Sequence, residues 1–319
     1  MTSRTSWPRF VSIPVDLRPT GAARRQRVIE RIVKAVLGAF ASGTVLVSVL
    51  VVVALARPAI DFFRSVPIGD FLGSVDWKPL FTPSRFGVWS IVVGSLWVAG
   101  IALLVAVPLG LGAALYLSEY ASQRMRSVLK PLLEVLAGIP TVVFGFFALT
   151  FINPNIVRKL WPVGDVGAYS VLAAGIATGI MIIPTVASLS EDAMAAVPAS
   201  LRQAGYALGA SKREVASAVV FPAALSGIIA AVVLAMGRAI GETTIAVLAA
   251  GSRAELVTNP GEGAQTMAGF IGFAGIGDQP TGSVGYKSIF AVGMLLFIIT
   301  LGLNALSMKV VARFKETYE

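Results

Sequence analysis

The sequence predicts an all-α polytopic membrane protein with six transmembrane helices. Of its 319 residues, 56% are hydrophobic and only 13% are charged, whereas soluble domains carry about 25% charged residues. Several windows contain no charge over about 20 residues, enough for a helix to cross roughly 30 Å of hydrocarbon. The chain has neither Cys nor His, which excludes disulfides, thiol nucleophiles, Cys/His metal sites and histidine proton relays.

Apolar runs separated by charged or glycine-rich loops define the predicted spans. The first run begins near Ala35, after a basic tail over residues 1–30, and it fits a retained anchor better than a cleaved signal. Pro108 and Pro222 predict kinks in the second and fifth spans. The transmembrane domain is expected over residues 31–319, with spans at 35–56, 88–117, 131–152, 168–189, 217–250 and 288–308.

The distribution of Lys and Arg predicts the orientation of these spans. With an even number of spans, both termini lie on one side of the membrane, and that side collects 17 of the 26 Lys and Arg residues. The other side has eight, and Arg238 lies inside a span. Because cytoplasmic loops are enriched in Lys and Arg, we expect a multi-pass protein of the inner (plasma) membrane with both termini in the cytoplasm.

The loop over residues 190–216 predicts a short helix that is capped at both ends. Pro198 fits a first helical turn, and Gly209 suits the left-handed conformation that ends many helices. Ser211 and Glu214 have the spacing of a capping box for the next helix. Four residues recur with helical spacing as one small apolar face: Leu201, Ala204, Gly205 and Leu208. Local physics allows either an ordinary interfacial helix or a rigid knob that docks on a cytoplasmic partner.

This loop resembles a motif of ABC importer permeases, which reads E-A-A, three residues, G, nine residues, I, one residue, L-P. At the same spacing the chain has Gln203-Ala204-Gly205, then Gly209, then Val219, Phe221 and Pro222, so that Gln203 replaces the usual Glu. The resemblance implies the type I ABC importer permease fold, in which this segment is the coupling helix that fits a cleft on the ATPase subunit. The coupling residues that it implies are Leu201, Gln203, Ala204, Gly205, Leu208 and Gly209.

Span five carries two ionisable residues, Arg238 and Glu242, in an otherwise apolar stretch. A charged side chain at the centre of a bilayer costs about 2.5–3.5 kcal/mol on insertion scales. Residues four apart in a continuous helix share a face, so the two charges can neutralise each other. Gly237 and Gly241 would allow another helix to approach closely. The pair is therefore either a structural ion pair that locks helices together or a charged lining of a translocation pathway.

The same stretch resembles the permease subunits of phosphate-specific (Pst) ABC importers. Their G-R-A-I-G-E-T sequence stands unchanged at residues 237–243. The outer loop, with Asp-Trp-Lys-Pro at 76–79 and Phe-Gly at 86–87, is similar to the C-type subunit (PstC), as is the stretch at 138–145. The resemblance covers residues 30–315. It implies that Arg238 and Glu242 take part in phosphate passage, and the hydroxyls of Thr243 and Thr244 lie nearby in the sequence.

The resemblance also implies the partners of this chain. The chain has no G-x-x-x-x-G-K-[ST] phosphate loop, so we expect it to have no enzyme activity and no cofactor. ATP hydrolysis would be carried out by a dimer of ATP-binding subunits (PstB-like). A second permease subunit (PstA-like) would complete the pathway. An extracytoplasmic phosphate-binding protein (PstS-like) would dock on the outer loops, residues 57–86 and 251–285.

Three other classes of membrane protein compete with a phosphate permease. An ABC permease for another oxyanion, such as sulfate, molybdate or phosphonate, would have the same coupling loop. A self-sufficient secondary transporter would show an internal repeat with broken helices at matching positions, and the sequence has neither feature. A membrane enzyme would need a carboxylate pair, a Ser/His pair or a metal cluster, and the sequence has no such constellation.

Overall fold

The computed structural model describes residues 21–162 and 164–314, and nearly all of its regular structure is helical. The chain divides into two units after Val53. The described part of the first unit belongs to one long helix, α1 (Gly21–Ser65), with a candidate span over Val28–Ser65. Residues 21–30, expected in the basic tail, are therefore helical, while residues 1–20 of that tail lie outside the described residues. The apolar side chains of α1 between residues 28 and 53 are mostly exposed, as a lipid-facing helix requires, whereas Ala59 and Phe62 near its end are buried.

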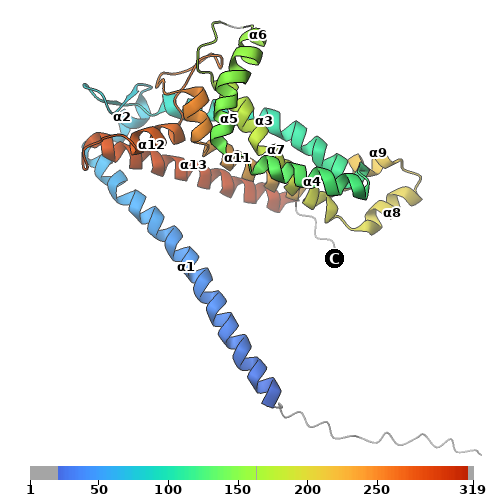
Figure 1. Cartoon of the computed structure of the whole chain (residues 1–319). Coiled ribbons are helices and arrows are strands. Elements are labelled where there is room, and N and C mark those ends of the chain that lie inside the picture. The colour runs from blue at the N-terminus through green and yellow to red at the C-terminus, as the bar shows by residue number, and fades with distance from the viewer. Residues whose placement is uncertain (1–20, 163, 315–319) are drawn as a thin grey trace, which may run out of the picture. The chain divides into compact units, whose positions relative to one another are not determined.

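The second unit holds the remaining elements (Figure 1). Its first half contains α2 (Ile68–Gly73), the strands β1 (Trp77–Lys78) and β2 (Arg85–Phe86), α3 (Trp89–Leu115) with the π-helical turn Tyr116–Tyr120, α4 (Gln123–Ala137), α5 (Thr141–Phe147), the π-helical segment Ala148–Val157, α6 (Arg158–Leu160) and α7 (Val171–Ala195). Its second half contains α8 (Ala199–Ala207), α9 (Lys212–Glu214), the π-helical segment Val215–Val220, α10 (Phe221–Ala223), α11 (Leu225–Ile240), the π-helical turn Ala246–Ala250, α12 (Met267–Gly275) and α13 (Val284–Phe314).

Helices α3 and α7 form the centre of the second unit because glycines bring their backbones together. A side chain at Gly175 would meet Ile101 at 2.6 Å, and one at Gly179 would meet the carbonyl oxygen of Ala102 at 2.9 Å. Small residues at such crossings are typical of helices that pack in membranes. Helix α11 packs on α7, and α13 packs on α11.

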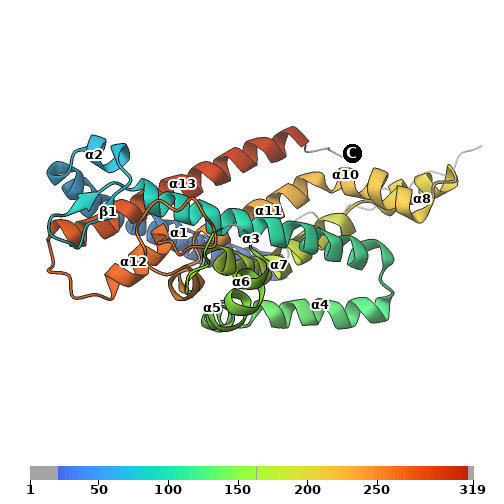
Figure 2. The same ribbon diagram turned by 90° about the horizontal axis from the view of Figure 1, so that it is seen from above.

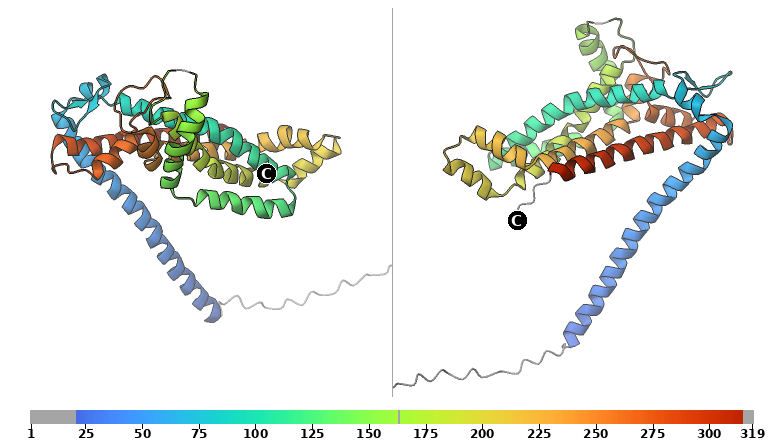
Figure 3. Two further views of the ribbon diagram at one scale, coloured as in Figure 1. Left: turned by 45° about the horizontal axis from the view of Figure 1, so that its top comes forward. Right: turned by 180° about the vertical axis from the view of Figure 1, so that it is seen from behind.

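The long helices separate two ends of this unit (Figure 2). At one end, the antiparallel β1–β2 hairpin and α2 lie close to α12, and an aromatic cluster joins them, with the rings of Trp77 and Phe270 edge to face at 5.0 Å. At the other end, α8 and α9 project beyond the long helices in both views of Figure 3. The predicted coupling helix thus lies opposite the predicted docking loops.

Five described helices are long and apolar enough to span a membrane, and a sixth span results if one bent pair is counted. The third span runs over Thr141–Leu160 rather than 131–152, because the chain turns at Gly138–Pro140 and α4 is a separate helix. The fifth span is broken as well. Lys212–Ala223 and Leu225–Ile240 meet at a bend of 69°, two residues after Pro222, and α11 ends ten residues before the expected limit at 250.

Candidate functional site

Arg238 lies in the last turn of α11, where the negative end of the helix dipole stabilises a positive charge. Its side chain is exposed, and Nη1 donates a hydrogen bond to Oγ1 of Thr185 on α7 at 3.2 Å. Within residues 21–162 and 164–314, no carboxylate forms an ion pair with it. Arg238 therefore presents an uncompensated positive charge on the protein surface.

Glu242 does not pair with Arg238, which corrects the expectation of a shared helix face. Helix α11 ends at Ile240, and Gly241 serves as its C-cap, so the four-residue spacing no longer places the two side chains together. The Glu242 carboxylate instead accepts hydrogen bonds from the backbone N–H groups of Thr244, at 3.0 Å, and Ile245, at 3.1 Å. Glu242 thereby caps the helical turn that follows the break.

A cavity of about 520 Å³ opens beside Arg238, between α7, α11 and α13. The residues that line it are Thr185, Leu234, Gly237, Arg238, Thr300 and Asn304. Nothing in the described chain lies within 4 Å of where a side chain on Gly237 would begin, so this glycine keeps the cavity open rather than admitting a neighbouring helix of the same chain. A second cavity of about 570 Å³ shares Leu234 and Asn304 with the first. Together they form one groove between α11 and α13.

The groove includes only part of the predicted site. Arg238 lines it, whereas Glu242, Thr243 and Thr244 are not among the lining residues. Thr243 instead lies against α12, where its methyl group would be 2.6 Å from a side chain built on Gly272. The structure adds three polar residues that the sequence did not single out: Thr185, Thr300 and Asn304. In the sequence, these residues could have been noticed as polar side chains within apolar spans. Asn304, for example, is the one carboxamide in α13.

The loop between α7 and α11 has the predicted caps. Gly209 has a φ of 81°, and the N–H groups of Gly209 and Ala210 donate to the carbonyl oxygens of Tyr206 and Gly205, which is the Schellman arrangement. The capping box of Ser211 and Glu214 is present with both reciprocal hydrogen bonds. Both predicted caps are confirmed, and the chain therefore turns sharply after α8.

The predicted apolar face of α8 is covered only in part. Leu201 packs against the cluster around Val215, and a side chain at Gly205 would meet Val215 at 3.0 Å. Leu208, in contrast, is 89% exposed, and Gln203 and Ala204 are also exposed. Leu208 is the C-cap and still has a nearly helical backbone (φ −82°, ψ 5°), so the four residues keep their helical spacing, with one edge of the face packed and the other uncovered. The exposed residues form a small surface with no cover in the described chain.

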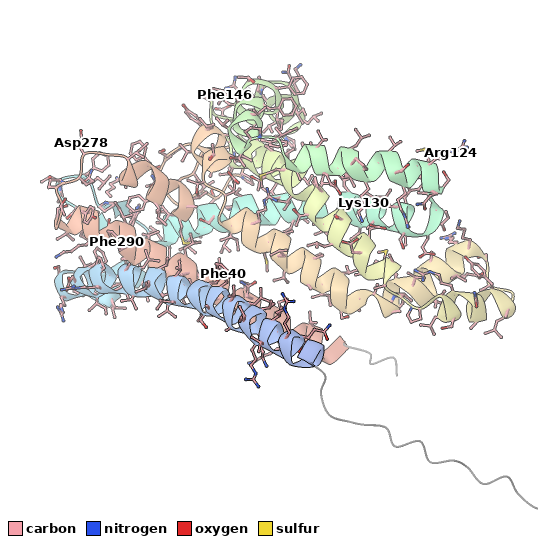
Figure 4. All side chains as sticks on the ribbon, turned by 60° about the horizontal axis from the view of Figure 1, so that its bottom comes forward. Phe40, Arg124, Lys130, Phe146, Asp278 and Phe290 are labelled. Carbon is pink, nitrogen blue, oxygen red and sulfur yellow. The ribbon has the colours of Figure 1, made fainter. Side chains whose placement is uncertain are left out.

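Ion pairs attach this end of the molecule to its core. Arg202 of α8 contacts the Glu119 carboxylate at 3.0 Å, and it also donates to the carbonyl oxygens of Met194 and Val197. Lys130 of α4, labelled in Figure 4, contacts two carboxylates of α7, Glu191 at 2.7 Å and Asp192 at 2.9 Å. Hydrogen bonds to Glu191 and Asp192 raise the pKa of Lys130 above its ordinary value of 10.5. Paired charges thus hold the end of the unit that carries the predicted coupling helix α8, here called the coupling end.

Comparison with known proteins identifies the class of transporter. Residues 106–314 match the family described as "Binding-protein-dependent transport system inner membrane component". The chain belongs to this family. It is 36% identical to the probable ABC transporter permease protein YqgH of Bacillus subtilis over 72% of this chain and 74% of that protein. It is 30% identical to the phosphate transport system permease protein PstC of Mesorhizobium japonicum, over 79% and 83% of the two chains.

The fold agrees with the family. A bacterial ABC transporter involved in the import of the acidic polysaccharide alginate has a TM-score of 0.54 to this chain, with 15% identity over 84% of this chain and 96% of that one. The protein is therefore an ABC importer permease, a multi-span inner-membrane subunit that works with an ATPase and a binding protein. Its relatives are transport permease subunits rather than enzymes.

Proposed function

We propose that this permease subunit carries inorganic phosphate and forms half of the translocation pathway. One observation supports this most directly: Arg238 is exposed in a groove between spans, without a carboxylate partner in the described chain. A permanent guanidinium in an apolar surrounding lowers the barrier for an anion and offers several N–H donors to its oxygens. The name of the PstC relative and the unchanged G-R-A-I-G-E-T stretch favour phosphate over sulfate, molybdate or phosphonate.

The same proposal assigns roles to the two ends of the molecule. The exposed surface of α8, with Gln203, Ala204, Leu208 and Gly209, contacts the PstB-like ATPase dimer and transmits its motion to the spans. The end built from α2, the hairpin and the loop before α12 receives a PstS-like phosphate-binding protein. A PstA-like permease supplies the other half of the pathway, since Arg238 and Asn304 of the groove are exposed.

Uptake by the assembled complex tests the substrate. Vesicles that contain this chain, its second permease, the ATPase and the binding protein should accumulate labelled phosphate only with ATP, and labelled sulfate at no more than background. ATP-dependent sulfate uptake at a rate equal to or above that of phosphate would refute the phosphate assignment and favour the alternative oxyanion.

The orientation is a separate proposal with its own measurement. Both termini and the α8 loop face the cytoplasm, because the Lys and Arg residues collect on that side. Single cysteines at Ser200 and Ser74 can be compared, since the chain has none of its own. An impermeant thiol reagent added to intact spheroplasts should modify position 74 and leave position 200 unmodified; the reverse pattern would invert the topology.

A further inference from the structure

The groove beside Arg238 contains hydrogen-bonding groups of two kinds, and each kind can be assigned from the contacts. Arg238 donates to Thr185 Oγ1, so the Thr185 hydroxyl keeps its own hydrogen for another acceptor. Asn304 is exposed and its side chain has no partner in the described chain, so its carboxamide can both donate and accept. Three groups of the groove can therefore donate to an anion: Arg238, Thr185 and Asn304.

Thr300 differs from these because its hydroxyl hydrogen is already used. Its Oγ1 lies 2.9 Å from the carbonyl oxygen of Leu296 and 3.0 Å from that of Phe297, one turn back in α13. A hydroxyl has one hydrogen and two lone pairs, so while Thr300 keeps these backbone bonds it offers only an acceptor to a molecule in the groove. Thr300 and Asn304 are four residues apart on α13, and both line the cavity that Arg238 lines. An anion held by Arg238 can form a hydrogen bond to the Thr300 oxygen only if the anion itself carries a proton.

We propose that Thr185, Arg238, Thr300 and Asn304 form an anion station that selects oxyanions retaining a proton, with Thr300 as the specificity-determining residue. This inference rests on the proposed phosphate function and deepens it. At neutral pH both ionic forms of inorganic phosphate keep at least one P–OH group, which can donate to Thr300 Oγ1. Sulfate and molybdate have no such hydrogen, so they leave Thr300 unpaired and bring their own lone pairs against it, which is unfavourable.

The station also lies where a substrate that leaves Arg238 would travel. Helices α11 and α13 run antiparallel, because residue numbers along the groove fall on α11 as they rise on α13. One part of the groove is lined by Gly237 and Arg238 with Thr300 and Asn304. The other is lined by Ala230 with Val311 and Ala312. The groove therefore continues from Arg238 towards the start of α11, the end of the unit where α8 lies (Figure 2). Selection at Thr300 thus acts on an anion within the pathway, after the binding protein has released it.

A cysteine reporter tests the station without relying on transport. Leu234 lines both parts of the groove and is exposed, so Leu234→Cys in this cysteine-free chain places a single thiol there, in a complex with cysteine-free partners and no binding protein. The rate of modification by a negatively charged thiosulfonate is measured at increasing phosphate or sulfate. We expect phosphate to slow the reaction at about tenfold lower concentration than sulfate, the value of one hydrogen bond to a charged group.

Thr300→Val should abolish this preference by weakening protection by phosphate about tenfold, with protection by sulfate unchanged or improved. Thr150→Val is the matched control, because Thr150 Oγ1 makes the same backbone bond, to Phe146 at 2.7 Å, on an exposed position outside the groove. Equal protection by the two anions, a Thr300→Val complex with unchanged preference, or a reporter that no reagent reaches would each overturn the inference.

Lipid headgroups carry the same phosphate chemistry, and the composition of the bilayer distinguishes them from free phosphate. If phosphatidylglycerol-rich bilayers protect the reporter with no added phosphate and zwitterionic bilayers do not, the groove is a lipid headgroup site and the inference fails. If vesicles take up phosphate normally while Thr300→Val leaves the preference intact, the station fails and the proposed function stands. If phosphate protects the reporter in a Thr300-dependent way while the complete complex does not transport it, the station stands and the proposed function fails.

Discussion

Two regions of this permease contain charged side chains near apolar helices. In one region the charges are buried and form ion pairs, and in the other the charge is exposed and has no ion-pair partner in the described chain. At the coupling end, Glu191 is only 3% exposed and is paired with Lys130 and Arg126, while the buried Glu119 is paired with Arg202. In the groove, Arg238 is exposed, and among the described residues its side chain donates a hydrogen bond to the neutral hydroxyl of Thr185 and forms no ion pair. The same types of side chain thus serve attachment in one region and remain available in the other.

Under the proposed function, the difference follows from what each region has to do. A buried charge without a partner is costly, so charges that hold helices together must be neutralised within the chain. Lys130 joins α4 to α7, and Arg202 joins α8 to the π-helical turn that follows α3. A charge that must bind a passing anion cannot be neutralised permanently, because a resident carboxylate would compete with the substrate. The break after Ile240 removes Glu242 from Arg238 and leaves the guanidinium free.

The largest expected effect is the loss of stability when Glu191 is replaced. Glu191→Ala removes the buried carboxylate that contacts both Lys130 and Arg126. It should lower the free energy of unfolding by about 3 kcal/mol, the upper end of the scale for lost hydrogen bonds to charged groups. Asp192→Ala is the matched control on the same helix. Asp192 contacts the same lysine at 2.9 Å but is 59% exposed, so its loss should cost less than about 1 kcal/mol. Melting of the purified complex measures both, and equal losses would refute the distinction.

The next largest effect tests whether Arg238 binds the anion or instead belongs to a structural ion pair. Arg238→Gln should reduce ATP-dependent phosphate uptake about a hundredfold, equivalent to about 2.7 kcal/mol of lost stabilisation of the passing anion, while assembly and melting stay unchanged. Arg238→Lys should retain part of the rate, because the charge remains although the planar fork is lost.

The exchange of the two charges completes this test. If Arg238 and Glu242 formed a structural pair, Arg238→Glu combined with Glu242→Arg would restore transport. Because Glu242 caps the turn that begins at Thr244 and does not contact Arg238, we expect the double variant to remain as inactive as Arg238→Glu alone. Recovery of uptake in the double variant would restore the pairing hypothesis and remove the argument for a free charge.

Local sequence signals predicted the coupling end better than the groove. The Schellman turn at Gly209 and the capping box at Ser211 depend on a few neighbouring residues, so spacing alone identifies them. The groove depends on which helices meet: Thr185, Arg238 and Asn304 come from three different spans. A helical-wheel argument also failed at Glu242, since it assumed a continuous helix and interpreted Gly241 as a packing position, whereas Gly241 is the C-cap at which α11 stops. The start of the third span was misplaced for the same reason at Gly138–Pro140.

The smallest expected effect tests whether the shape of the coupling end matters independently of its charges. Gly209 has a φ of 81°, and nothing in the described chain lies within 4 Å of where its side chain would begin, so the backbone conformation is what demands glycine. A β-branched residue is disfavoured there by about 1–2 kcal/mol, and Gly209→Val should therefore open the turn and re-aim the exposed Leu208. We expect less phosphate transported per ATP hydrolysed, with Arg238 and its groove unaffected. Gly209→Asn is the matched control, because Asn tolerates the left-handed conformation and should keep most of the coupling. Equal coupling ratios in the two variants would show that the turn after α8 has no part in transmitting ATPase motion.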